Sequence, residues 1–330
     1  MASYILRRLL YMVFTLWLLS VVAFILIQLP PGDYLTIYIS GLQQQGDMAN
    51  TETLESLRAR YGLDRSPVEQ YLRWFVRFIQ GDMGQSFEHN RAVVDLLRDR
   101  VPSTVMLSLV TLAFTYAVAV PIGIYVATHQ YTLGDYIFSV IGFIGLGTPG
   151  FMLALILMYF FFKYLGISVG GLFSPQYAAA PWSLARAWDL FRHLWIPILV
   201  SGLAGTAGLI RVMRGTLLDE LGKQYVITAR AKGVPEGRLL FKYPVRLAIT
   251  PIVSTIGWQL PNILSGQTII AVVLSLPTVG PLLLRALLAQ DMFVAGSVVM
   301  VLGILTLIGT LLSDILLVIV DPRIRFERKA

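Results

Sequence analysis

The chain has 330 residues, of which 56% are hydrophobic and 14% charged, and its net charge is +7. Soluble domains carry about 25% charged residues, so this composition indicates a membrane protein. The sequence contains no cysteine, which excludes disulfides, thiolate metal sites and cysteine nucleophiles. The positive charge is explained better by Lys and Arg gathered on one side of a membrane than by binding to nucleic acid.

Six charge-free windows have the length of membrane spans, which take about 20 mostly apolar residues each. They cover residues 9–32, 101–128, 136–162, 193–210, 247–284 and 292–313. The fifth window is too long for one span, and its prolines at 261, 277 and 281 indicate one helix followed by a broken re-entry. The first window resembles a signal peptide, but its apolar run is too long and no small-residue cleavage site follows, so we expect a retained span. The expected fold is an all-α integral membrane protein with six transmembrane helices.

The distribution of Lys and Arg predicts which connections face the cytoplasm, because short cytoplasmic loops are enriched in these residues. Arg7 and Arg8 precede the first span, eight Lys or Arg occur in residues 211–246, and four follow Asp321. These regions place both termini in the cytoplasm. The connection 33–100 then forms a large loop outside, and its eight basic residues do not contradict the rule because long loops cross largely regardless of charge.

The basic region between the fourth and fifth spans has the pattern of two helices joined at a glycine. Helical spacing of apolar residues predicts one helix over Thr216–Lys232. Gly233 suits the left-handed position that ends many helices, and Pro235 suits the first turn of the next helix. Small side chains at Ala229 and Ala231 would let another protein approach the backbone. Composition alone favours an ordinary basic loop held by lipid charge, whereas the rigid helix–glycine–helix pattern favours a docking element.

Polar residues gather in the fifth span, where burial in the membrane makes them costly. Together with Gly257 and Gly266 they either line a translocation pathway or form interhelical hydrogen bonds beside close-packed glycines. The sequence leaves both interpretations open. The four residues are Gln259, Asn262, Ser265 and Gln267.

The outer connection contains one aromatic helical face, whose residues stand at i, i+3, i+4 and i+7. They are Tyr71, Trp74, Phe75 and Phe78. The simpler interpretation is an amphipathic helix that lies at the membrane surface. The functional interpretation is a platform on which an external binding protein docks, and the two are compatible.

Motifs along nearly the whole chain resemble permeases of binding-protein-dependent ABC importers, in the branch that takes up dipeptides, oligopeptides and nickel. The segment "TARAKG" (residues 228–233) is similar to that branch's variant of the coupling-loop motif, which in general is EAA, three residues and then Gly. Further matches follow in the family's order: "PGD" (31–33), "YGLDRSPVEQYLRWFVRFIQGDMGQSF" (61–87), "RVPSTVMLSL" (100–109), "GLGTPGF" (145–151), "LPTVG" (276–280) and "DPRIRF" (321–326).

The chain departs from the family pattern at three places. Ile227 stands where the general motif has its Glu, and Thr228 stands at the next position, so a salt bridge made by that Glu elsewhere is not carried over. "YPVR" (243–246) stands where the general pattern ends in Ile-x-Leu-Pro. Apolar "AVVL" (271–274) stands where many relatives have an acidic residue, which leaves the substrate open.

The resemblance implies a permease subunit in a bacterial or archaeal inner or plasma membrane. Residues 1–100 would form the first span and outer loop, and residues 101–330 a five-helix core with a coupling loop at about 214–246. The implied partners are a second similar permease, two ATPase subunits, an extracytoplasmic binding protein and membrane lipid. ATP and Mg²⁺ would bind the ATPase subunits, with no cofactor on this chain. The residues implied to meet the ATPase are Thr228, Ala229, Arg230, Ala231, Lys232, Gly233 and Arg238.

Short peptides are the leading expectation for the substrate, although permeases for nickel chelates, glutathione and oligosaccharides look alike. The glycines of "GLAGTAGLIR" (202–211) are not followed by Gly-Lys-Ser/Thr, so ATP hydrolysis by this chain is not expected. An ion-coupled secondary transporter would need inverted repeats and charges at the membrane midplane. An intramembrane enzyme would need a nucleophile–base pair or metal ligands. Neither pattern is visible, and we expect no catalytic or metal-binding residue.

Overall fold

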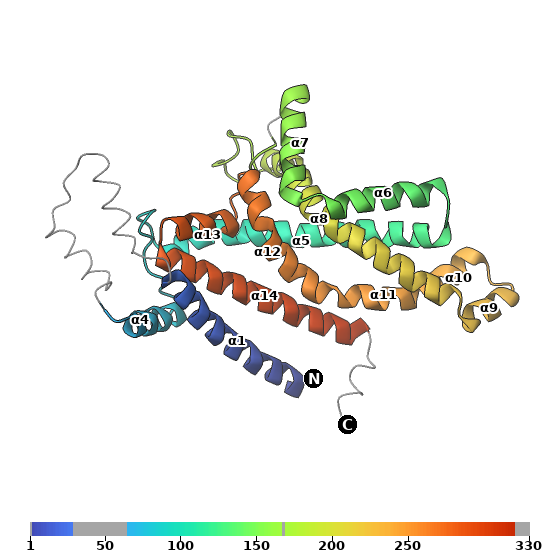
Figure 1. Cartoon of the computed structure of the whole chain (residues 1–330), viewed down its shortest axis with the longest axis horizontal. Coiled ribbons are helices and arrows are strands. Elements are labelled where there is room, and N and C mark those ends of the chain that lie inside the picture. Colours follow the sequence, from blue (N-terminus) through green and yellow to red (C-terminus); the bar gives the residue numbers. More distant parts are fainter. Residues whose placement is uncertain (1, 29–64, 167–168, 321–330) are drawn as a thin grey trace. The chain divides into compact units, whose positions relative to one another are not determined.

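The computed structural model describes residues 2–28, 65–166 and 169–320. Over these ranges the chain is helical, and the only β-type pairing described is an isolated bridge between Gln85 and Ala92. The prediction of an all-α fold is confirmed (Figure 1). The helices are α1 (Ala2–Gln28), α4 (Pro67–Ile79), α5 (Val93–Thr128), α6 (Leu133–Gly147), α7 (Gly150–Leu165), α8 (Leu184–Leu221), α9 (Gln224–Ala231), α10 (Glu236–Lys242), α11 (Pro244–Ser254), α12 (Ile256–Val273), α13 (Val279–Leu288) and α14 (Met292–Val320).

Four of the described helices are long and apolar enough to cross a membrane, namely α1, α5, α8 and α14. Six spans result if each of two bent helix pairs counts as one span. The first pair is α6 with α7, bent by 107°, and the second runs from α10 and α11 to α12, bent by 51°. Over the described residues, each of the six charge-free windows overlaps one of these elements, and the fifth also reaches α13.

The third predicted span, residues 136–162, is therefore not one continuous helix. α6 ends at Gly147 and α7 begins at Gly150, at the 107° bend. Thr148 between them is extended, with φ −99° and ψ 122°. The cause is Pro149, because a proline disfavours helical backbone in the residue before it.

The prolines of the fifth window act differently from one another. Pro261 lies inside α12 and does not end that helix, contrary to the expectation that it would interrupt the span. Pro277 lies in the turn between α12 and α13. Pro281 occupies the first turn of α13, where its missing N–H removes no helical hydrogen bond.

The described chain divides into two compact units. One contains residues 1–103 and 278–307, and the other contains residues 104–277 and 308–330. α5 and α14 therefore contribute to both. The division at residue 100 that the family resemblance implies stays a prediction.

An aromatic cluster holds α4 in the first unit. Trp74 of α4 and Phe24 of α1 are buried together with Met300 of α14. A Cβ added at Gly296 would come within 2.9 Å of the Trp74 ring, so the bare backbone of this glycine makes room for the indole. At the start of α14 the buried carboxylate of Asp291 accepts hydrogen bonds from Ser86 Oγ at 2.7 Å and from the backbone N–H of residue 87 at 2.8 Å. These contacts fasten the loop after α4.

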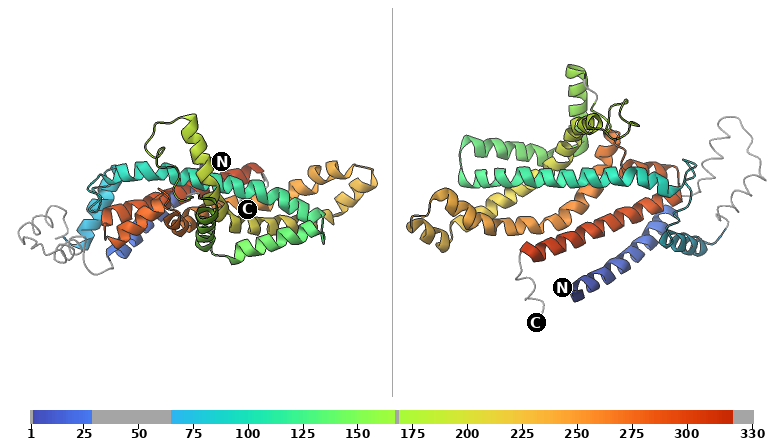
Figure 2. Two further views of the ribbon diagram at one scale, coloured as in Figure 1. Left: turned by 90° about the horizontal axis from the view of Figure 1, so that it is seen from above. Right: turned by 180° about the vertical axis from the view of Figure 1, so that it is seen from behind.

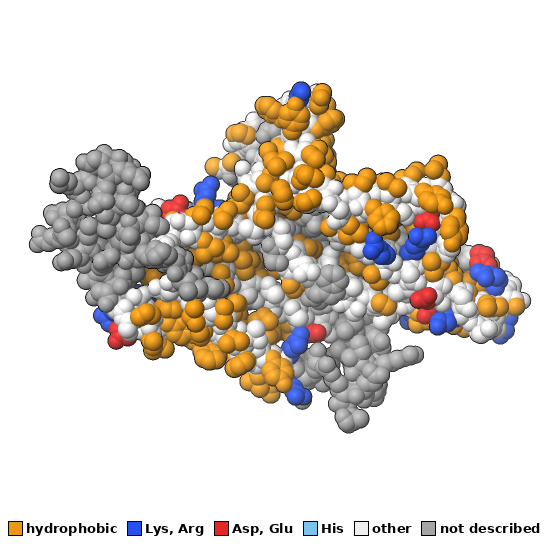
Figure 3. All heavy atoms as spheres, viewed as in Figure 1, with side chains coloured by type: hydrophobic (Ala, Val, Ile, Leu, Met, Phe, Trp, Pro, Cys, Tyr) orange, Lys and Arg blue, Asp and Glu red, His pale blue; other side chains and the backbone are white. Residues whose placement is uncertain are grey.

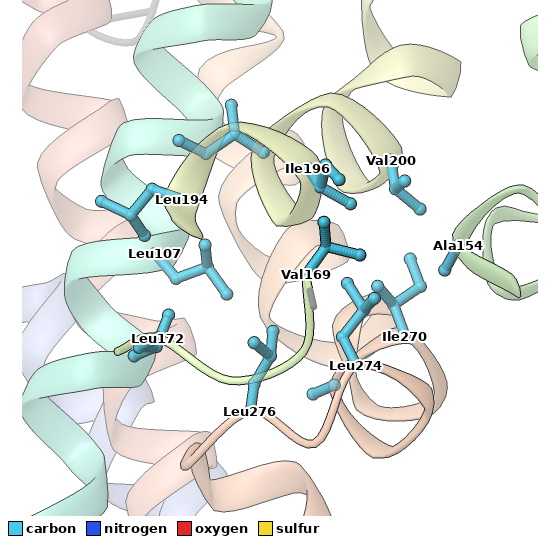
Figure 4. Close-up of a cluster of buried hydrophobic side chains, with 12 residues drawn as sticks. Leu107, Ala154, Val169, Leu172, Leu194, Ile196, Val200, Ile270, Leu274 and Leu276 are labelled. Carbon is cyan, nitrogen blue, oxygen red and sulfur yellow. The ribbon is translucent and has the colours of Figure 1, made fainter. Parts of the chain in front are cut away.

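The second unit is organised around α8, which contacts α6, α7, α11 and α12. α5 and α6 run side by side in antiparallel directions (Figures 1 and 2). Apolar side chains from α5, α7, α8 and α12 meet in one core, which includes Leu107, Ala154, Ile196 and Ile270 (Figure 4). A second core between α5, α8 and α11 includes Met213, Leu217 and Ile252.

Candidate functional site

The predicted coupling residues lie on a short helical hairpin formed by residues 224–242, which we call the coupling element. α9 ends at Ala231, and Gly233 follows with φ 76°. That is the left-handed conformation expected from the sequence, and it is confirmed. Its N–H donates to the carbonyl of Arg230 at 3.0 Å, and the next N–H, of Val234, donates to that of Ala229 at 3.3 Å. Figure 1 shows α9 and α10 extending together beyond the end of α8.

The helix predicted over Thr216–Lys232 is wrong as a single element. α8 ends at Leu221, Gly222 caps it, and α9 begins at Gln224. The break is made at Lys223, whose backbone is extended with φ −74° and ψ 148°. Pro235 is the N-cap of α10, with φ −57° and ψ 137°, and so lies one residue before the predicted first turn.

An ion pair fastens the two helices of the coupling element across the turn. The Arg230 guanidinium donates to both carboxylate oxygens of Glu236, at 2.5 and 3.2 Å. The hydrogen bond from Arg230 is the main reason that the pKa of Glu236 is lowered, and the same contact raises the pKa of Arg230. Arg230 is thus bound to Glu236 inside the element, a contact that the sequence did not reveal.

Two buried residues and one hydrogen bond hold the coupling element on its base. Val226 of α9 and Leu239 of α10 are fully buried. The Tyr225 hydroxyl donates to the Glu220 carboxylate at the end of α8. Burial is the main cause that raises the pKa of Tyr225 to about 12, and this hydrogen bond is the second. The phenol therefore keeps its proton at physiological pH.

Most of the other predicted coupling residues are on the surface of the element. Ala229 is half-buried, whereas Thr228, Ala231, Lys232, Gly233 and Arg238 are exposed. A Cβ added at Gly233 would meet no atom within 4 Å. The tip of the element is therefore an open surface with small residues and two cationic side chains. Their contact with an ATPase stays a prediction.

A cleft of about 480 Å³ opens between α8 and α12 in the second unit. Three of the four predicted pathway residues line it, namely Gln259, Asn262 and Gln267. The structure thus brings together residues that the sequence placed only on the same span. The side chain of the fourth, Ser265, lies outside the described residues.

The three polar side chains take different places in the cleft wall. Gln259 is buried, and its amide faces Gly205 of α8, where a Cβ would collide with it. Gln267 is also buried and donates to Thr111 Oγ1 of α5 at 3.4 Å. Asn262 is the exposed member of the set. Packing beside glycine and lining of the cleft therefore occur together, and passage of a substrate through this cleft stays a prediction.

The opposite wall of the cleft was not predicted from the sequence. It is formed by small residues of α8 at i, i+3, i+4 and i+7, namely Ser201, Ala204, Gly205 and Gly208. This spacing puts them on one helix face, and it is visible in "SGLAGTAG" (201–208).

The aromatic face of α4 packs mainly against other helices and is largely not exposed. Trp74 is 5% exposed, and Tyr71, Phe75 and Phe78 pack partly buried around it. Tyr71 also bonds Ser20 of α1 at 2.9 Å. The exposed side of α4 carries other apolar residues, namely Val68, Leu72, Val76 and Ile79. Docking of a partner through Trp74 itself conflicts with this burial, because the ring faces α1 and α14.

Among the described residues, no three His, Asp or Glu side chains are grouped so that they could hold a metal ion. The lining of the cleft carries no Asp, Glu, Lys or Arg. The cleft is thus a neutral surface with amide and hydroxyl groups.

Known protein families match both the N-terminal and the C-terminal part of the chain. Residues 119–326 match the family described as "Binding-protein-dependent transport system inner membrane component", and residues 1–108 match its N-terminal companion. Relatives align over almost their full length. The oligopeptide transport system permease protein AppB of Bacillus subtilis is 32% identical over 99% of this chain and 100% of that protein.

Two further relatives agree. The putative peptide permease protein BOV_A0351 of Brucella ovis is 35% identical over 98% of this chain and 99% of its own length. The oligopeptide transport system permease protein OppB of Haemophilus influenzae is 29% identical over 99% and 100%. The first family match includes the coupling element and the cleft, and the chain belongs to the family of inner membrane components of binding-protein-dependent transport systems.

Proposed function

We propose that this chain is a permease subunit of an ATP-driven importer that forms part of the translocation pathway for short peptides. An extracytoplasmic binding protein delivers the peptide, and ATPase subunits on the cytoplasmic side supply the energy. This chain is not the site of ATP hydrolysis and holds no cofactor of its own; ATP and Mg²⁺ bind the partner ATPase subunits.

The observation that carries the proposal is that one helix, α8, joins the cleft to the coupling element. Residues 200–212 of α8 line the cleft, and the same helix ends at Leu221, three residues before α9 begins. The return path is equally short, because α10 contacts α11 and α11 contacts both α8 and α12. A displacement of the coupling element is therefore transmitted to both walls of the cleft through packed helices.

The chemistry of the cleft supports a peptide as the substrate. Its polar side chains are amides, such as Gln259 and Asn262, and a hydroxyl, Ser201. A side-chain amide both donates and accepts hydrogen bonds, and so does each peptide bond of a substrate. The names of the relatives, which refer to peptide and oligopeptide transport, point the same way.

The assembly that fits this role contains a second similar permease, two ATPase subunits and the binding protein. Both termini and the coupling element face the cytoplasm, as the Lys and Arg of residues 211–246 favour. ATP closes the ATPase pair, the coupling elements move with it, and the cleft opens outward to accept the peptide. Hydrolysis then returns the subunits to the inward-facing arrangement.

The experiment is purification of the chain from its native cells with whatever subunits accompany it, followed by reconstitution in vesicles. The proposal expects ATPase subunits to co-purify and labelled tripeptides to accumulate only with ATP and the binding protein. Uptake of a nickel chelate, glutathione or an oligosaccharide instead would change the substrate and leave the permease role. Uptake driven by an ion gradient without ATP would contradict the proposal.

A further inference from the structure

The first turns of α8 expose a row of large apolar side chains, which we call the outer aromatic face. Its four members are Leu184, Trp188, Phe191 and Trp195, which stand at i, i+4, i+7 and i+11 and are 92%, 58%, 66% and 40% exposed. This spacing puts them on one side of the helix. Trp188 and Phe191 stack on one another with ring centroids 5.6 Å apart.

The opposite side of the same turns packs on the protein and includes a buried charge. Asp189 is buried there, where its carboxylate accepts hydrogen bonds from the Ser174 N–H at 2.8 Å and the Ser174 hydroxyl at 2.7 Å. The backbone carbonyl of Asp189 is 2.8 Å from His193 Nδ1. The side that packs on the protein also buries Leu194. A helix that faces water keeps its large apolar groups inside, whereas these turns expose four of theirs. An apolar medium is therefore expected to cover the outer aromatic face.

The connection before α8 is built to hold this helix in place. The guanidinium of Arg186 lies 4.7 Å from the ring centroids of both Phe173 and Trp182. It also donates hydrogen bonds to the carbonyls of Ala178 and Ala180. These contacts tie residues 173–182 to the first turn of α8, so the outer aromatic face is presented by an ordered segment.

A change of direction in α8 separates these turns from the rest of the helix. Figure 2 shows α8 bending along its course, and Pro197 lies inside it. Interior prolines are a common cause of helix kinks. The turns after the bend line the cleft and run toward the coupling element. The turns before it are thus free to lie along a surface while the others cross the bilayer.

We propose that the outer aromatic face is a membrane-interface anchor that lies in the lipid headgroup layer on the extracytoplasmic side. Trp and Tyr gather at this depth because they combine an apolar ring with a polar group. Arg192 is exposed beside the face, with its guanidinium 5.7 Å from the Trp188 ring centroid. From there it reaches the phosphate of a lipid headgroup while its stem covers the ring.

A second group of residues at the far end of α7 has the same chemistry. Lys163 Nζ donates to the Tyr159 hydroxyl at 2.7 Å and lies 5.5 Å from the ring centroid of Tyr164. Figure 3 shows α7 covered with hydrophobic side chains. Aromatic–cation groups thus bracket the connection between α7 and α8, which favours lipid over a protein partner. The side of the membrane rests on the proposed topology; contact with the interface does not.

The test uses spin labels, because the chain has no native cysteine. Single-cysteine variants Leu184→Cys and Phe191→Cys are labelled and reconstituted with their partner subunits in vesicles of phosphatidylethanolamine and phosphatidylglycerol. Collision of the label with oxygen and with a water-soluble nickel chelate gives its depth. Ile141→Cys on exposed α6 serves as the hydrocarbon reference, and Lys223→Cys serves as the aqueous reference.

The proposal expects both face labels to lie between the references, with less nickel contact than residue 223 and less oxygen contact than residue 141. Arg192→Glu should raise nickel contact at residue 184 in phosphatidylglycerol vesicles but not in phosphatidylcholine. Nickel contact equal to that of residue 223 would overturn the proposal. So would nickel contact that falls only when the binding protein is added, because that protein would then be the partner. Peptide uptake, measured in the same vesicles, tests the proposed function separately.

Discussion

Arg214 of α8 donates to the carboxylate of Asp135 at 2.8 Å, and this ion pair ties α8 to the first turn of α6. Asp135 is 3% exposed and also accepts a hydrogen bond from the backbone N–H of Tyr131 at 3.0 Å. The pair lies in the last third of α8, between the turns that line the cleft and the coupling element. It therefore fixes the short α5–α6 connection to α8, the helix that would transmit a movement of the coupling element to the cleft.

Removal of Arg214 should destabilise the chain. Arg214→Gln leaves the Asp135 carboxylate buried without its counter-charge, which costs about 3 kcal/mol. The expected result is a lower melting temperature of the purified complex in detergent. The exchanged pair Asp135→Arg/Arg214→Asp should recover part of the loss, and an unchanged melting temperature in Arg214→Gln would show that the pair contributes nothing.

Two glycines of α8 provide a matched pair for the pathway. A Cβ at Gly205 would collide with the Gln259 amide, whereas a Cβ at Gly215, which does not line the cleft, would meet no atom within 4 Å. Gly205→Ala should displace the amide and lower peptide uptake, with assembly intact. Gly215→Ala should leave uptake near that of the wild type, because it changes neither the cleft nor its packing and alanine is tolerated in a helix. Equal uptake in both variants would argue that Gln259 has no part in the pathway.

The exposed amide of the cleft gives an independent test. Asn262→Leu keeps a side chain of similar size but removes its hydrogen-bonding groups, so binding of a peptide backbone in the cleft should weaken. We expect lower uptake with normal recovery of the complex. Ile269→Leu, on the same helix but absent from the cleft lining, is the control, and normal uptake in Asn262→Leu would restrict this residue to helix packing.

The repeated apolar runs were enough to predict helices and the all-α class, because both follow from local composition. Gly233 was predictable for the same reason, since few other residues adopt φ 76° without strain. The 107° bend at Thr148–Pro149 was not anticipated, although proline marked the place. A charge-free window reports only that a segment is apolar, and not whether it is straight.

Contacts between residues far apart in the chain could not be predicted from the sequence. Trp74 looked like part of a docking surface because helical spacing shows which residues share a face, but not what that face packs against. Arg230 looked available for a partner, yet Glu236 binds it across the turn. The pairing of Gln259 with Gly205 needed α8 and α12 to be side by side, a tertiary relationship that neither segment encodes alone.

The ion pair across the coupling element predicts how the element responds to acid. Arg230 lowers the pKa of Glu236 below its ordinary 4.5, so the pair is formed at neutral pH and is lost only as the pH falls through that lowered value. Glu236→Gln should therefore loosen the α9–α10 turn at pH 7, seen as greater mobility of a spin label at Ala231→Cys. Tyr225→Phe, which breaks the contact with Glu220 instead, should leave this label unchanged. Equal mobility in Glu236→Gln and the wild type would contradict the fastening role.

The topology can be tested in whole cells with single cysteines and a thiol reagent that does not cross the membrane. A cysteine at Gln44, which lies outside the described residues, should be labelled from outside. A cysteine at Gln224, at the start of α9, should be labelled only after the cells are permeabilised. The reverse pattern would turn the coupling element to the outside and exclude its contact with a cytoplasmic ATPase.

The central claim is that the coupling element transmits the work of an ATPase, and Gly233 tests it. A side chain there adds about 1–2 kcal/mol of backbone strain and covers the open tip. Gly166, at the end of α7, is the matched control, because it has φ 66° and equally open surroundings. Lys232→Glu/Arg238→Glu reverses the charge of the tip without touching the Arg230–Glu236 pair.

The most direct measurement is the ATPase activity of the reconstituted complex, stimulated by the binding protein. Gly233→Val and Lys232→Glu/Arg238→Glu should each insert in the membrane but lose this stimulation or release the ATPase subunits on purification. Gly166→Val should keep both. Stimulation and subunit recovery at wild-type levels in both tip variants would contradict the account and reduce residues 224–242 to a basic connection that faces lipid.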